Sequence, residues 1–280
     1  MKKIILLFVI VFLLIGIIYF EKNRAAPTPV SLPSSSPRGS PIPSPTPRPL
    51  TFAEMQQLYG PCVHLPVLMY HHVEEKEKAL SGGFKALNVE PSIFRSQLEY
   101  LKNKGYKTLS PSDLVAFFDS GQGISPKSVI LTFDDGYSDF ASQAFPILAE
   151  YGNKATLFLP TGLMGNPMYL TWDSVNWVAA SGLVYVANHT WSHKNVAKSP
   201  EVAQKEISLA AKQLSERGLD NLKIFAYPYG VESSSARDFL NKEGYELAFT
   251  TRPGSTLCKK QRFSLPRIRI GNTSLSSYGL

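Results

Sequence analysis

"LTFDDGYSDF", residues 131–140, places two adjacent aspartates between an apolar run and a glycine. Residues 128–133, SVILTF, form a short uncharged run with several β-branched side chains, which predicts a buried strand. In α/β proteins, the loops that follow the strands carry binding and catalytic residues. Asp134 and Asp135 therefore belong either to a solvated turn or to a paired site at a strand end, and the rest of the chain has to decide between the two.

Similar apolar runs recur along the chain and predict six further strands, at 65–73, 154–160, 182–190, 223–230, 246–251 and 267–271. Amphipathic stretches between the runs predict helices at 92–106, 138–151, 172–181, 199–218 and 233–243. This alternation is typical of a mainly parallel sheet covered by helices. The expected fold class is α/β, and about seven strand–helix units favour a closed or nearly closed barrel.

The histidines gather at the predicted strand ends. Four of the five fall there: His71, His72, His189 and His193. His189 and His193 are four residues apart, so a helical turn after the strand would point both imidazoles the same way, a spacing that suits zinc. Two ligands are too few for a metal site, and the aspartate pair can supply the third.

Several motifs in order give the chain a resemblance to a known family. "YHHV", "LTFDDGY", "ATLFL", "LTW", "HTWSH" and "YPYG" together resemble the polysaccharide deacetylase domain, the NodB-homology fold of carbohydrate esterase family 4. The resemblance covers residues 65–271. It implies a distorted (β/α)7 barrel and an enzyme that hydrolyses N-acetyl groups of a polysaccharide, releasing acetate.

The resemblance also implies roles for individual residues. Asp135, His189 and His193 become the ligands of a divalent metal ion, with Zn²⁺ expected and Co²⁺ or Ni²⁺ as alternatives. Asp134 becomes the general base that takes a proton from the attacking water. The backbone N–H of Tyr229, in "YPYG", becomes a donor to the oxyanion beside the metal.

Adjacent acids can divide these two roles if the chain around them is extended. In a β-like segment the side chains of Asp134 and Asp135 would point in opposite directions, so that only one faces the metal squarely. Gly136 would then allow a sharp turn where a Cβ could clash.

The sequence departs from the commonest pattern of the family in two places. No histidine follows His193, whereas the general acid is usually a histidine near the C-terminus. "YHHV" precedes the aspartates instead, as in permuted members that resemble poly-N-acetylglucosamine deacetylases, and their acid maps onto His71, with the adjacent His72 left open. The arginine that usually opens the proline motif is also missing. Arg267 is the candidate to orient the base, and a surface arginine is the alternative.

The first 50 residues differ in composition from the rest. Residues 4–20 are uncharged and mostly apolar, long enough with their flanks to cross a bilayer, so 1–24 are expected to be a membrane anchor rather than a cleaved signal peptide. Proline recurs among Ser and Thr in 25–50, which predicts a disordered, extended linker. Residues 51–280 are then a single deacetylase domain outside the cell, attached to the membrane through its N-terminal helix.

Cys62 and Cys258 are the only cysteines. They could form one disulfide across a very long loop or remain as two buried thiols. Their spacing excludes a CxxC zinc site.

The net charge of +7 favours attraction to anionic surfaces, and the scattered basic residues do not suggest a nucleic-acid partner. A monomer that acts on poly-N-acetylglucosamine is expected. Peptidoglycan, chitin and acetylated xylan stay open as substrates, as does a catalytically inactive polysaccharide-binding module.

Overall fold

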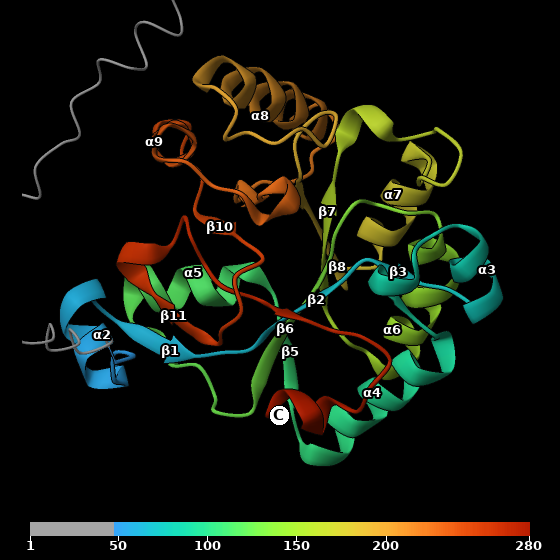
Figure 1. The fold of residues 1–280 in the computed structure, drawn as a ribbon, viewed down its shortest axis with the longest axis horizontal. Coiled ribbons are helices and arrows are strands. Elements are labelled where there is room, and N and C mark those ends of the chain that lie inside the picture. The colour runs from blue at the N-terminus through green and yellow to red at the C-terminus, as the bar shows by residue number, and fades with distance from the viewer. Residues whose placement is uncertain (1–47) are drawn as a thin grey trace, which may run out of the picture. The chain divides into compact units, whose positions relative to one another are not determined.

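A curled parallel sheet of eight strands forms the centre of the protein, a computed structural model that describes residues 48–280 (Figure 1). The strands follow the order β10–β9–β8–β7–β6–β2–β12, and β5 pairs with the first half of β6. Their bounds are β2 Val67–Tyr70, β5 Lys107–Leu109, β6 Ser128–Phe133, β7 Ala155–Leu159, β8 Val184–Asn188, β9 Ile224–Ala226, β10 Leu247–Phe249 and β12 Ile268–Arg269. All seven predicted runs contain one of these strands, and the α/β class is confirmed.

The two ends of the strand order approach each other through residues 265–269. Leu265 makes a parallel bridge to Phe249 of β10, and Ile268 in the same segment pairs with Leu68 of β2. One short segment therefore contacts both ends of the sheet. The sheet curls towards the predicted barrel, but it closes through one isolated bridge and a two-residue pairing rather than through a continuous ladder.

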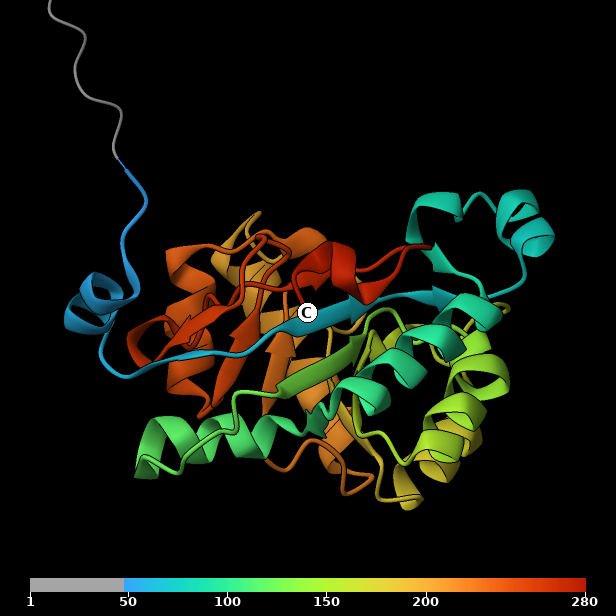
Figure 2. The same ribbon diagram turned by 90° about the horizontal axis from the view of Figure 1, so that it is seen from below.

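Helices cover the outside of this sheet (Figures 1 and 2). The predicted helices appear as α4 Pro91–Lys104, α6 Phe145–Tyr151, α7 Trp172–Ala180, α8 Pro200–Ser215 and α9 Ser234–Lys242. A π-helical turn, Phe140–Ala144, precedes α6 within the stretch predicted as one helix. Three further helices were not predicted: α2 Phe52–Tyr59, α3 Lys76–Ser81 and α5 Pro111–Ser120.

Burial explains why β6 could be predicted from its sequence. All six of its residues are buried, because neighbouring strands and helices cover both faces of a parallel sheet. Phe94 and Leu98 of α4 lie in the same buried cluster as Leu131 and Phe133 of β6. The apolar run thus ends at Phe133, at the carboxyl edge of the sheet, and the chain emerges there with Asp134.

Two small sheets complete the fold. β3, His72–Val73, pairs with β4, Asn88–Val89. β1, Cys62–His64, runs antiparallel to β11, Thr256–Cys258, with Cys62 directly opposite Cys258. The two cysteines form a disulfide with Cα atoms 4.1 Å apart, so the open choice between a disulfide and free thiols is decided for the disulfide.

The predicted membrane anchor, 1–24, and residues 25–47 of the predicted linker lie outside the described residues. Between residues 48 and 280, no helix combines the length and the apolar character that a membrane span requires. Residues Pro49–Leu280 form one compact unit.

Candidate active site

Asp134 follows β6 directly and is fixed by both its backbone and its side chain. Its N–H donates to the carbonyl of Tyr70, at the end of the neighbouring strand β2, at 3.0 Å. Arg267 donates two parallel hydrogen bonds to its carboxylate, at 2.7 and 2.6 Å. Burial alone would raise the pKa of Asp134, but the charge and hydrogen bonds of Arg267 outweigh it and lower that pKa below its ordinary value.

Arg267 is fully buried, so the alternative of a surface arginine is wrong. Its Nε donates to the carbonyl of Thr250 at 2.9 Å, and its Nη1 donates to the hydroxyl of Thr132 at 3.1 Å. These contacts from β6 and from the end of β10 set the plane of the guanidinium. A bidentate arginine in a fixed plane also fixes the orientation of the carboxylate of Asp134.

The chain turns in a left-handed conformation immediately after Asp134. Asp135 has φ 73° and Gly136 has φ 65°. The expected extended backbone is therefore wrong at Asp135, and a turn rather than strand alternation separates the two carboxylates. A Cβ on Gly136 would lie 2.6 Å from Leu159 Cδ2, which is the physical reason for glycine there.

His189 follows β8, which β7 separates from β6, and its side chain reaches the turn after β6. Its Nδ1 lies 2.7 Å from the carbonyl oxygen of Ala226, to which it donates, because a carbonyl only accepts. Nε2 is then left with its lone pair, and it lies 3.3 Å from Asp135 Oδ1. This backbone contact orients the imidazole as a second partner commonly orients a metal-binding histidine.

His193 reaches the same oxygen, with its Nε2 at 3.0 Å from Asp135 Oδ1. The helical turn expected between His189 and His193 is wrong, because the segment is irregular, with positive φ at Thr190 and at His193. The buried Glu206 of α8 holds the segment by accepting hydrogen bonds from the N–H and the hydroxyl of Ser192 at 2.7 and 2.8 Å. The two imidazoles meet because tertiary contacts shape this loop.

The three groups fit a metal ion. Ligand atoms of Asp135, His189 and His193 all lie within 4.8 Å of one another. Asp135 Oδ1 is buried and makes no hydrogen bond, although both Nε2 atoms are close to it. Tetrahedral ligands at about 2.1 Å from a zinc ion lie roughly 3.4 Å apart, which is close to the 3.3 and 3.0 Å that separate Asp135 Oδ1 from the two imidazoles.

Tyr229 lies next to the cluster, with its ring edge-on to His193 at a centroid distance of 4.7 Å. Its backbone has φ 61°, and its side chain is largely exposed. Gly230 follows in close contact with the next loop, where a Cβ would lie 2.0 Å from Thr251 Oγ1. The turn thus places the ring of Tyr229 against His193, and the part of its backbone N–H in oxyanion binding stays a prediction.

His71 and His72 face different surroundings. His71 is buried near both aspartates; burial lowers its pKa to about 4, while Asp134 and Asp135 act in the opposite direction. His72 instead places its Nδ1 at 2.5 Å from Asp139 Oδ2. The geometry favours His71, rather than His72, as the histidine that acts together with Asp134 and Asp135. Its role as the acid stays a prediction.

A supporting set of residues around the site was not predicted. Thr132 holds Arg267, Glu206 holds the loop before His193, and Tyr137 interacts with the carboxylate of Asp135. Asn188 directly precedes His189; its side-chain N–H donates to the Tyr245 hydroxyl at 2.6 Å, and its side-chain oxygen accepts from Thr190 N–H at 2.8 Å. The contacts of Thr132 with Arg267, of Glu206 with Ser192 and of Asn188 with Tyr245 have no local sequence signal, because each joins residues at least 14 positions apart.

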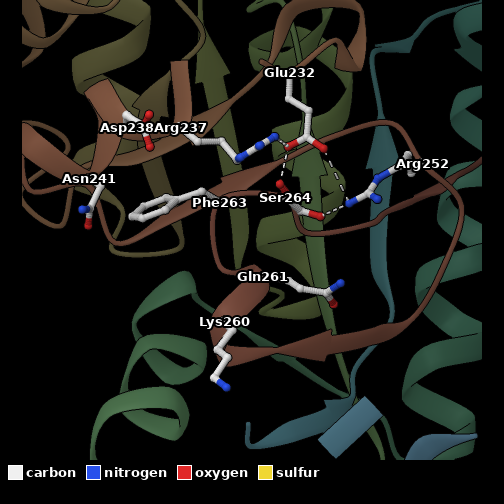
Figure 3. A pocket seen from close by; sticks show the side chains of 9 residues that line it. All are labelled: Glu232, Arg237, Asp238, Asn241, Arg252, Lys260, Gln261, Phe263 and Ser264. Atoms are coloured by element: carbon white, nitrogen blue, oxygen red, sulfur yellow. Dashed lines mark hydrogen bonds and ion pairs between the residues drawn. The ribbon is translucent and has the colours of Figure 1, made fainter. Parts of the chain in front are cut away.

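A polar cavity of about 440 Å³ borders the loop that follows Tyr229 (Figure 3). Glu232 lines it, 3.3 Å from the guanidinium of Arg237 and 3.9 Å from that of Arg252, and it accepts a hydrogen bond from Ser264. The negative charge of Glu232 and the positive charges of Arg237 and Arg252 largely compensate one another. The network connects the Tyr229 loop to the loop that follows β10.

A curled parallel sheet that carries an Asp–His–His group beside an arginine-held carboxylate defines a hydrolase-type site. The family model described as polysaccharide deacetylase matches residues 122–248. YxkH of Bacillus subtilis, whose name places it among the polysaccharide deacetylases, is 30% identical over 77% of this chain and 75% of its own length. The chain belongs to the polysaccharide deacetylase family, as the motifs predicted, and it is an enzyme of the hydrolase class.

Two other similarities are informative. The poly-β-1,6-N-acetyl-D-glucosamine N-deacetylase of Escherichia coli K12 is 28% identical over 73% of this chain, which spans only 36% of that protein. The deacetylase PplD of Streptococcus pyogenes, solved in complex with acetate, is 32% identical with a TM-score of 0.66, over 74% of this chain and 92% of its own.

Proposed function

We propose that this protein hydrolyses the N-acetyl groups of poly-N-acetylglucosamine outside the cell, with the help of a divalent metal ion, and releases acetate. One observation carries the proposal. The carboxylate of Asp134, which Arg267 holds, belongs to the residue directly before Asp135, and Asp135 forms a possible metal site with His189 and His193. A base next to a group of metal ligands is what metal-assisted hydrolysis requires.

Asp135, His189 and His193 would hold the metal, for which we propose Zn²⁺, with Co²⁺ or Ni²⁺ as alternatives. When bound, such an ion polarises a carbonyl and makes water a stronger nucleophile near neutral pH. Asp134 remains ionised because Arg267 lowers its pKa, so its carboxylate is ready to take the proton from the attacking water. Arg267 keeps that carboxylate at a fixed angle during the transfer.

His71 is proposed to give a proton to the leaving amine. Its lowered pKa leaves the free imidazole neutral at pH 7, so it has to gain a proton within the reaction cycle. The nearby aspartates favour the protonated imidazole and would support that uptake. The N–H of Tyr229 is proposed to donate to the oxyanion, since its loop lies against His193.

The substrate and the location are the less direct parts of the proposal. The "YHHV" motif ahead of the aspartates and the name of the Escherichia coli relative support poly-N-acetylglucosamine. The disulfide and the apolar run 4–20 support an extracellular domain attached to a membrane. Peptidoglycan, chitin and acetylated xylan are the competing substrates.

Acetate release from these four polymers tests the proposal. We expect the fastest release from poly-N-acetylglucosamine, loss of release after chelation, and recovery with Zn²⁺, Co²⁺ or Ni²⁺. Asp134→Asn should abolish release without reducing metal content, because Asp134 is not a proposed ligand. An enzyme that no metal restores would contradict the metal-dependent mechanism, and binding without any acetate release would favour a binding module.

A further inference from the structure

A second cavity, of about 370 Å³, lies beside the candidate active site. His72 and Asp139 line it, together with Glu74, Phe84 and Met168. Tyr137 lies between this cavity and the metal group, because its ring stacks on His72 at 3.7 Å while the tyrosine also interacts with the carboxylate of Asp135. One aromatic ring therefore links the two sites.

His72 and Asp139 form a buried pair in the wall of this cavity. Their side chains are each only 5% exposed, and the ring of His72 contacts Tyr137 and also Phe84, whose centroid is 4.3 Å away. His72 Nδ1 donates to Asp139 Oδ2 at 2.5 Å, which leaves Nε2 as an acceptor in the neutral ring.

Two polar atoms of this pair are unpartnered. His72 Nε2 and Asp139 Oδ1 are buried without a hydrogen bond, an arrangement that native proteins rarely leave unsatisfied. Both are acceptors, so the missing partner has to be a donor. The other acid of the wall, Glu74, is already paired with Lys78 at 2.5 Å and offers less to a ligand.

We propose that this cavity is a sugar subsite, which binds the polymer unit next to the one whose acetamide is hydrolysed. The hydroxyl groups of a hexosamine would donate to His72 Nε2 and Asp139 Oδ1. Its apolar face would lie against Phe84 and Met168, as sugar rings do on apolar side chains. The proposal rests on the proposed function, and it makes His72 a substrate-binding residue of the chain rather than its acid.

Two variants test the subsite. His72→Asn keeps a donor near the position of Nδ1 for Asp139 and removes the acceptor Nε2, whereas Met168→Ala shortens a side chain that is 52% exposed. The readout is the ratio of kcat/KM for a penta-N-acetylglucosamine to kcat/KM for 4-nitrophenyl acetate, which is too small to span both sites. His64→Asn is the matched control, because His64 is an exposed histidine outside both cavities.

We expect His72→Asn to lower the ratio about tenfold, mainly through KM, as loss of a uniform binding contact predicts. Met168→Ala should lower it by a smaller factor, and His64→Asn should leave it unchanged. An equal fall in kcat/KM for both substrates would show a structural role for His72, and unchanged kcat/KM values for both substrates would show a water-filled cavity. Either result overturns the subsite.

A binding measurement separates this proposal from the proposed function. Calorimetric titration of Asp134→Asn with the pentasaccharide should give a Kd that His72→Asn weakens about tenfold, whether or not acetate is released. If no polymer releases acetate but His72→Asn still weakens binding, only the deacetylase function is refuted. Full release from poly-N-acetylglucosamine with an unchanged Kd would refute the subsite alone.

Discussion

Arg267 and Asp134, 133 residues apart in the chain, meet in a bidentate ion pair from which solvent is almost excluded. Side-chain exposure is 0% for the arginine and 3% for the aspartate. Removing one partner of such a pair leaves a buried charge uncompensated, which is more costly than loss of the attraction itself. The pair therefore links the stability of the fold to the orientation of the proposed base.

Arg267→Ala should lower the free energy of unfolding by about 3–5 kcal/mol, as measured by urea denaturation. Arg267→Lys should keep part of the stability but lower kcat about 100-fold, because an ammonium cannot fix the plane of the carboxylate. Arg95→Lys, at an exposed ion pair with Glu150, is the control and should change little. Full activity in Arg267→Lys would refute the orienting role.

Gly136→Ala should reduce metal binding as well as stability. The added Cβ meets Leu159 in a left-handed turn, and moving that turn displaces Asp135. Gly152→Ala is a matched control, since φ is 63° there and a Cβ would have nothing within 4 Å. Both variants should lose about 1 kcal/mol through backbone strain, but only Gly136→Ala should lose bound metal, measured by elemental analysis. Normal metal content in Gly136→Ala would contradict this assignment.

His71→Ala should lower kcat on the polymer by about 100-fold or more, within the range of general acid catalysis, and leave the metal content unchanged. His72→Ala should act mainly on KM for oligomers, because the ring of His72 faces Asp139 and the neighbouring cavity. Steady-state kinetics on the two variants separates these effects. Loss of turnover in His72→Ala alone would show that the assignment of the acid to His71 is wrong.

Asp220 should make stability fall as pH rises. Burial raises the pKa of Asp220 from 3.8 to about 8, although Ile224 N–H and the hydroxyl of Tyr185 donate to it. Between these two values the folded protein keeps a proton that the unfolded chain releases. The free energy of unfolding should therefore decrease from about pH 4 to pH 8, by up to about 1.4 kcal/mol per pH unit from this group.

Asp220→Asn tests this slope, because its amide oxygen can accept the same two hydrogen bonds without titrating. Urea denaturation at a series of pH values should show a flatter profile for Asp220→Asn than for the wild type. Asp173→Asn, an exposed position, should leave the profile unchanged. The same slope in Asp220→Asn and in the wild type would mean that another group causes it.

Reduction of the disulfide between Cys62 and Cys258 should lower the free energy of unfolding by about 2–5 kcal/mol, since the bond closes a loop with a sequence separation of 196. The paired Cys62→Ser and Cys258→Ser variant should show the same loss in the absence of reductant. Equal stability of the oxidised and reduced wild-type protein would contradict this expectation.

The elements that could be predicted are those in which buried apolar side chains form a run or recur at a regular spacing in the sequence. β6 has the bounds predicted from SVILTF, and α4 and α8 follow from apolar side chains at helical spacing. The helix α5 and the paired strands β1 and β11 were not predicted. The two strands are only three residues long and are held by each other and by the disulfide, so neither carries a pattern of its own.

The sequence by itself determined which aspartates and histidines are available for the site and in which motifs they occur. The paired aspartates after a buried strand, two histidines four residues apart and a histidine ahead of them, together with the other quoted motifs, predicted the family and the candidate residues. Only the tertiary structure decided how these side chains are oriented. A left-handed turn at Asp135, a loop held by Glu206 and the approach of residues 265–269 to both ends of the sheet bring atoms together that no local pattern relates. Contacts between residues far apart in the chain depend on the packing of the whole sheet, and short-range periodicity contains no information about that packing.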